Sequence, residues 1–215
     1  HIEEIGDIRM LSIREHRFPF LEKVDNWNRF NENTGGTLVE KCCHFFDLMN
    51  LIVPSKPIKV YASGGQDVNH LDEKYDGKTP DIIDNSFVIV DYQDGQRAML
   101  DLCMFAEAGK YEQEIVLTGD QGKLETHIPG NELLLTNRKN YSLKTIEVKD
   151  DPRVKEVGFH HGASYIEHLE LIDCIKNKKK PLVDCQKGLD SIILGLAAQE
   201  SIQTGEPVFL ENFLN

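Results

Sequence analysis

Apolar and polar residues alternate along much of the chain, with a period of two that predicts β-strands. The alternating runs are residues 6–17, 58–62, 87–92, 96–105, 112–118, 123–128, 132–136 and 143–148. The gaps at 93–95 and 119–122 carry the Asp and Gly residues of tight hairpin turns. Because strands joined by tight turns pair antiparallel, the pattern predicts a meandering, mostly antiparallel sheet.

Helical spacing of apolar residues replaces this alternation at residues 37–52, 164–176 and 185–204. The first of these helices follows two glycines, and the second begins with a Ser-x-x-Glu capping box. Asp184 and Gly205 are residue types that begin and end helices, and they bound the third. We expect a core-facing side made mostly from Tyr165, His168, Leu169, Ile172 and Ile175 in the second helix, and from Leu189, Ile192, Ile193, Leu196 and Ala197 in the third.

The order of these elements, a strand, a helix, several strands and then two helices, predicts an α+β fold. We expect a large, mostly antiparallel open β-sheet with helices packed on one face. Strands 87–92 and 98–105 are apolar on both sides, so the face without helices is expected to be buried by a partner. A length of 215 residues suits one large domain.

Composition and charge exclude several classes of function. A net charge of −12 argues against nucleic acid, because phosphate binding needs a basic surface. No apolar run approaches the roughly 20 residues that cross a bilayer, which argues against a membrane protein. The five cysteines form no Cys-x-x-Cys pair, which is typical of reduced thiols in the cytoplasm. The chain starts with His1 rather than Met, so we expect it to be part of a longer protein.

The most promising chemistry lies in the first helical stretch. On a continuous helix, Glu40, His44 and Asp47 fall at i, i+4 and i+7 and share one face. A histidine between two carboxylates suits a general acid/base that works near neutral pH. The alternative is a solvated polar face on which Glu40 and His44 form an ordinary ion pair.

This stretch resembles a known family signature. Gly35-Gly36 followed by Glu40-Lys41-Cys42-Cys43-His44-Phe45-Phe46-Asp47 is similar to the Gly-Gly, Asp-x-Gly-x-His-x-x-Asp motif of the Gfo/Idh/MocA oxidoreductases. Position 40 is Glu where the family more often has Asp, and position 42 is Cys where it more often has Gly. These departures bear on the substrate more than on the reaction class. The end of the last helix, from Ala197 to Val208, also resembles the end of that family's C-terminal domain.

The resemblance implies roles for individual residues. His44 matches the family's catalytic histidine and Glu40 its partner carboxylate, while Asp47 and Lys41 become substrate contacts. Further candidates for substrate binding lie outside the motif, at Arg17, Trp27, Arg29, His160 and His161.

Each of these outlying candidates has a second interpretation. Trp27 either walls the pocket or anchors its loop on the core. His160 and His161 either enter the pocket or lie in solvent. Metal binding by this pair is a third and less favoured interpretation, since no Cys or carboxylate stands beside it at zinc-ligand spacing. We predict no metal site.

By this resemblance, residues 1–215 are a C-terminal substrate-binding and oligomerisation domain, and the N-terminal Rossmann domain is absent from this chain. The whole protein is then expected to be a cytoplasmic NAD- or NADP-dependent dehydrogenase that acts on a hydroxyl of a sugar, polyol or similar molecule. The cofactor is held mainly by the missing domain, so the fragment alone should be inactive. A homodimer or homotetramer is expected to form through the open sheet face.

Two alternatives stay open. One is a redox-inactive family member that serves as an oligomerisation or scaffold module. The other is a lyase or glycosidase that uses a tightly bound NAD transiently.

Overall fold

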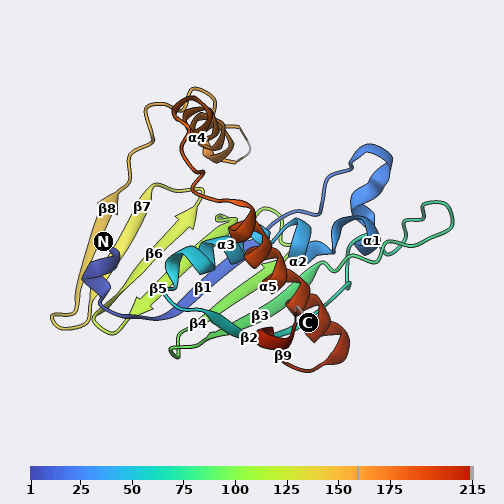
Figure 1. The fold of residues 1–215 in the computed structure, drawn as a ribbon, viewed down its shortest axis with the longest axis horizontal. Helices are drawn as coiled ribbons and strands as arrows, with labels where there is room; N and C mark the ends of the chain where they lie inside the picture. The colour runs from blue at the N-terminus through green and yellow to red at the C-terminus, as the bar shows by residue number, and fades with distance from the viewer. Residues whose placement is uncertain (159, 214–215) are drawn as a thin grey trace.

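A nine-stranded sheet forms the body of the molecule in a computed structural model that describes residues 1–158 and 160–213 (Figure 1). Its strands lie in the order β8-β7-β6-β5-β1-β4-β3-β2-β9. The strands are β1 Ile8–His16, β2 Pro57–Gly65, β3 Asn85–Tyr92, β4 Arg97–Cys103, β5 Gln113–Gly119, β6 Gly122–Ile128, β7 Glu132–Asn137, β8 Ser142–Glu147 and β9 Val208–Phe209. The mostly antiparallel open sheet of an α+β fold is therefore confirmed.

Strand β1 occupies a position that the turn pattern did not predict. It lies between β4, to which it runs parallel, and β5, to which it runs antiparallel. Ile13 pairs with Leu100 on one side and with Ile115 on the other. Short turns fix pairing only between neighbours in sequence, so the place of β1 depends on contacts between distant parts of the chain.

The first predicted helix is divided into shorter ones, while the other two closely match their predicted extents. They are η1 Ile2–Ile5, η2 Val24–Arg29, α1 Asn31–Thr34, α2 Thr37–Glu40, α3 Cys43–Ile52, α4 Ala163–Asn177, α5 Cys185–Thr204 and η3 Leu210–Asn212. The prediction of one continuous helix after the two glycines, over residues 37–52, was wrong, because α2 and α3 are separated at Lys41 and Cys42. The bounds of α5 are confirmed, and Asp184 caps it by accepting hydrogen bonds from the backbone N–H groups of Gln186 and Lys187.

The core lies between one face of the sheet and helices α3 and α5 (Figure 1). Its fully buried members include Phe46 and Met49 from α3 and Leu194 from α5. The α5 side chains that face the sheet were predicted wrongly: Ala197 is buried, but Leu189, Ile192 and Leu196 are exposed. Helix α5 is apolar around more than half of its circumference, so periodicity alone did not identify the covered side.

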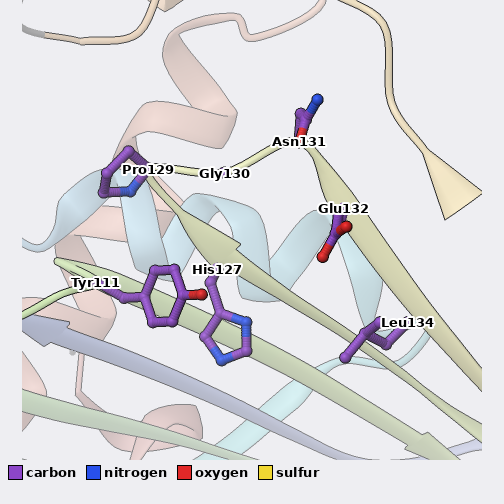
Figure 2. Close-up of a pocket in the computed structure, with 7 residues that line it drawn as sticks. All are labelled: Tyr111, His127, Pro129, Gly130, Asn131, Glu132 and Leu134. Carbon is purple, nitrogen blue, oxygen red and sulfur yellow. The ribbon is translucent and has the colours of Figure 1, made fainter. Parts of the chain in front are cut away.

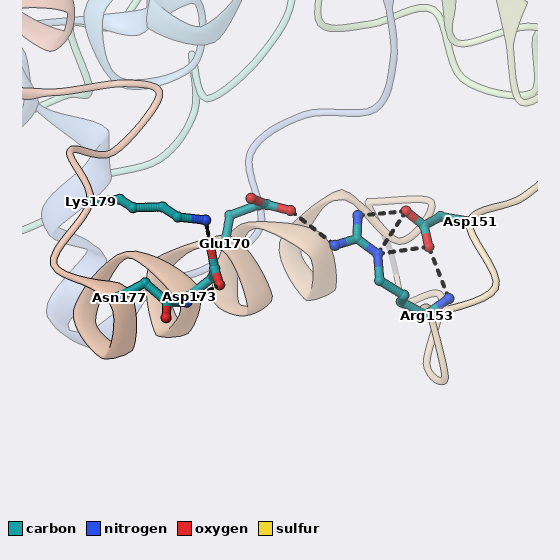
Figure 3. Close-up of polar contacts among 6 residues, drawn as sticks. All are labelled: Asp151, Arg153, Glu170, Asp173, Asn177 and Lys179. Carbon is teal, nitrogen blue, oxygen red and sulfur yellow. Dashed lines mark hydrogen bonds and ion pairs between the residues drawn. The ribbon is translucent and has the colours of Figure 1, made fainter.

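Helix α4 lies apart from the sheet (Figure 1) and contains no buried residue among those described. The prediction that its apolar side faces this domain's core was wrong, since Ile172 and Ile175 are 45% and 70% exposed. Local ion pairs hold the helix to the segment before it (Figure 3): Arg153 Nη1 donates to Glu170 at 3.0 Å, and Arg153 also pairs with Asp151. The helical period in the sequence shows that one side of α4 is apolar, but it does not show which surface covers that side.

On the opposite face of the sheet, the described residues form no covering helix (Figure 1). This face exposes large apolar side chains on neighbouring strands, with Tyr61 in register with Ile89 and Ile89 in register with Met99. Phe87 and Met10 are 59% and 58% exposed. Among the described residues, no helix combines the length and apolar character needed to cross a bilayer.

Candidate functional site

Two glycines set the start of the site. Gly35 and Gly36 have φ angles of +76° and +90°, which L-residues with side chains rarely adopt. They turn the chain from α1 into α2, where Gly36 lies against α5: a Cβ there would be 1.8 Å from Gln199 Nε2. The turn leads into α2, which packs against α5 and ends at Glu40, directly before Lys41.

The break between α2 and α3 changes the expected relationship of Glu40 and His44. Lys41 N–H still donates to the Thr37 carbonyl at 3.0 Å, and the helical bonding resumes where Phe46 N–H donates to the Cys42 carbonyl at 3.1 Å. Glu40 ends one helix and His44 lies in the next. Within the described part of the chain, no hydrogen bond or ion pair joins them. The role of Glu40 as partner carboxylate stays a prediction.

His44 is neutral at physiological pH. Its side chain retains exposed surface, yet its pKa is lowered to about 4. The largest cause is desolvation by the surrounding protein, and electrostatic interactions with Lys41, Arg17 and His160 lower the pKa further. The ring lies against Phe45, with centroids 4.1 Å apart. A neutral imidazole can accept a proton, which is the first requirement of a general base.

Lys41 and Arg17 come together over a buried carboxylate that the sequence analysis missed. Glu15, on β1, is completely buried, and its Oε1 lies 2.9 Å from Lys41 Nζ and 3.6 Å from Arg17 Nη1. The sequence held one signal for it, since Glu15 continues the inward-facing series of Leu11 and Ile13 where an apolar residue is expected. Lys41, Arg17 and Glu15 thus form a cluster in which a carboxylate that was not predicted holds two predicted substrate contacts together.

The other predicted contacts divide into two groups. His160 is close enough to His44 to contribute to its lowered pKa, and its Nδ1 lies 3.0 Å from Ser164 Oγ. His161 is exposed with a φ of +50° and makes no hydrogen bond or ion pair among the described residues. The structure therefore brings His160, and not His161, toward the site.

Trp27 and Arg29 lie on η2. Trp27 is 41% exposed, whereas Arg29 is buried and its Nε donates to Glu73 Oε2 at 3.1 Å. Glu73 also accepts from Tyr75 Oη at 2.8 Å and contacts His70 Nδ1 at the same distance. These bonds make Arg29 the anchor of the loop before β3, which favours a structural role over a place in the pocket wall.

Asp47 lines a cavity of about 280 Å³ one turn beyond His44 on α3. The start of α5 and the segment before it supply the opposite wall through Leu182, Val183 and Lys187. The cavity is large enough for part of a small ligand, and Asp47 is its acidic group nearest in sequence to His44. A substrate contact at Asp47 stays a prediction that this geometry can accommodate.

A second cavity, of about 210 Å³, lies at the far end of β6 (Figure 2). Tyr111 stacks on His127 with centroids 4.4 Å apart, and His127 Nε2 lies 2.9 Å from Glu114 Oε2. Pro129, Gly130, Asn131, Glu132 and Leu134 complete its lining. The sequence analysis did not predict this cavity, and its lining does not include His44 or the cluster of Lys41, Arg17 and Glu15.

We searched the chain for residues arranged to bind a dinucleotide cofactor or a metal ion. The sequence contains no Gly-x-Gly-x-x-Gly fingerprint for a dinucleotide. Among the described residues, no group of three or more His, Cys, Asp or Glu side chains is placed to hold a metal ion.

Comparisons with known proteins agree with this geometry. The C-terminal alpha/beta domain of the Gfo/Idh/MocA oxidoreductase family matches residues 1–210. A myo-inositol 2-dehydrogenase from Thermotoga maritima is 25% identical over 185 residues, which are 84% of this chain and 51% of that protein. The chain thus spans about half the length of this curated relative.

Solved structures share the fold. An oxidoreductase domain protein from Kribbella flavida superposes with a TM-score of 0.78 at 16% identity, over 97% of this chain and 60% of that one. An oxidoreductase from Agrobacterium radiobacter, in complex with NAD⁺, L-tartaric acid and magnesium, gives 0.74 at 15% identity, over 97% and 58%. The signature around His44, the open sheet and the match over residues 1–210 together show that the chain belongs to the Gfo/Idh/MocA oxidoreductase family, in which it corresponds to the C-terminal domain.

Proposed function

We propose that this chain supplies the proton-transfer and substrate-binding residues of an NAD(P)-dependent dehydrogenase that oxidises a hydroxyl of a sugar, a polyol or a similar small molecule. The observation that carries the proposal is a neutral His44 imidazole with Lys41 and Arg17 beside it. Two relatives support the reaction class: one is a myo-inositol 2-dehydrogenase, and another was crystallised with NAD⁺.

Alcohol oxidation removes a proton from oxygen and a hydride from the adjoining carbon. A bound nicotinamide supplies the hydride acceptor. His44 accepts the hydroxyl proton on a ring nitrogen as general base. The ammonium of Lys41 and the guanidinium of Arg17 stabilise the negative charge that develops on the substrate oxygen. They also make His44 a weaker base, and their stabilisation of the alkoxide offsets that loss.

The dinucleotide is held mainly outside this chain in our proposal, because the chain has no phosphate-binding glycine fingerprint. We expect the isolated chain to turn over no substrate. We further propose a homodimer or homotetramer in which the open sheet face, with Tyr61, Phe87 and Ile89, is buried against another copy.

Replacement of His44 tests the proposed reaction. In the full-length protein, His44→Asn should lower kcat by roughly 10²–10⁴-fold, the usual contribution of a positioned proton acceptor. The matched control is His1→Asn, because the His1 side chain is exposed and pairs locally with Glu4. Thermal melts of both variants check folding. Near-normal turnover by a folded His44→Asn protein would refute the role of His44.

A further inference from the structure

Glu15 is a buried charge that the proposed reaction does not use. It is completely buried on β1, where its register partners are Leu102 on β4 and Gln113 on β5. Transfer of a carboxylate from water to such a position costs several kcal/mol unless cations compensate for it. An apolar residue would satisfy the sheet at this position, so the charge requires an explanation in what surrounds it.

Two cations share this one carboxylate. Lys41 Nζ and Arg17 Nη1 both form ion pairs with Glu15 Oε1, at 2.9 and 3.6 Å, while neither Glu15 oxygen has a hydrogen-bond partner among the described residues. The Lys41 and Arg17 side chains are only 13% and 15% exposed. Without Glu15, two positive charges would repel each other in a place of low hydration.

Lys41 and Arg17 keep hydrogen-bond donors that no described residue uses. Arg17 Nε donates to the Phe18 carbonyl at 3.2 Å, while its ion pair with Glu112, 3.8 Å from Nε, is longer than a hydrogen bond. The Lys41 ammonium and the Arg17 guanidinium both lie close enough to His44 to lower its pKa. Glu15 and Glu112 balance the two cations in formal charge, but unused N–H donors remain beside His44.

We propose that Lys41 and Arg17, held together by Glu15, form a binding site for an anionic group of the substrate beside His44. This inference rests on the proposed function and narrows its substrate to a hydroxylated molecule with a carboxylate or a phosphate group. A carboxylate or phosphate can accept hydrogen bonds from the unused donors of both cations at once, with a charge assistance that a neutral hydroxyl lacks. Arginine and lysine are also the side chains that bind carboxylate and phosphate oxygens most strongly in proteins.

Equilibrium binding of simple anions tests this site without turnover. Malonate and inorganic phosphate are titrated calorimetrically into the full-length protein at low salt and pH 7. We expect saturable binding of one of them, with malonate indicating a carboxylate substrate and phosphate a phosphorylated one. Lys41→Met should weaken that binding by roughly 10–100-fold, the usual worth of a hydrogen bond to a charged group.

Controls separate this site from general charge effects and from misfolding. Lys139→Met removes an exposed lysine between β7 and β8 and should leave anion binding unchanged. Arg17→Met is the second test variant, because Lys41 still neutralises Glu15 in it; it should also weaken binding. His44→Asn should retain anion binding even as turnover falls, so failure of the proposed reaction remains distinguishable from failure of this site. Absence of saturable binding by both anions, or wild-type affinity in Lys41→Met, would overturn the proposal.

Discussion

Individual charges near His44 help to set the pH range in which this side chain can act as a base. Its pKa is about 4, below the ordinary value of 6.5, because desolvation and electrostatic interactions with Lys41, Arg17 and His160 disfavour the protonated ring. The neutral form is the active one, so kcat/KM should be constant above that pKa and should fall as the pH drops through about 4. Lys41→Met removes one cation and should move this acidic limb toward higher pH. The measurement is kcat/KM against pH for both proteins, and an unshifted limb would show that Lys41 does not act on His44.

The packing of α2 against α5 depends on one glycine in α5. A Cβ at Gly195 would lie 2.6 Å from the Leu38 carbonyl oxygen of α2, the short helix that leads into Lys41. Gly195→Ala should therefore destabilise the fold by roughly 1–3 kcal/mol, despite the better helix propensity of alanine. Gly188, in the same helix, has no atom within 4 Å of an added Cβ, so Gly188→Ala should be neutral or stabilise by up to about 1 kcal/mol. Urea denaturation compares the two, and equal effects would contradict this view of the interface.

At the scale of the whole molecule, the uncovered sheet face predicts self-association. Ile89, 42% exposed, lies on this face between Tyr61 and Met99. Ile89→Lys places a charge there and should convert a dimer or tetramer into smaller species in light scattering. Tyr141→Lys is the control, because Tyr141 is 93% exposed outside any strand. A wild-type protein that is monomeric at micromolar concentration would exclude this interface.

The sequence by itself determined nearly all of the strands, the extent of α5 and the family. Alternation and turn residues predicted every strand except β9, and capping residues bounded α5, because these signals depend on neighbours along the chain. The motif around His44 indicates the family from the sequence alone.

Only the tertiary structure decided how those elements meet. The insertion of β1 between β4 and β5, the break at Lys41 and Cys42, and the burial of Glu15 beneath two cations all arise from contacts between distant segments. The exposure of α4 has the same origin. A local pattern shows which side of an element is apolar or charged, and tertiary packing determines which surface that side contacts.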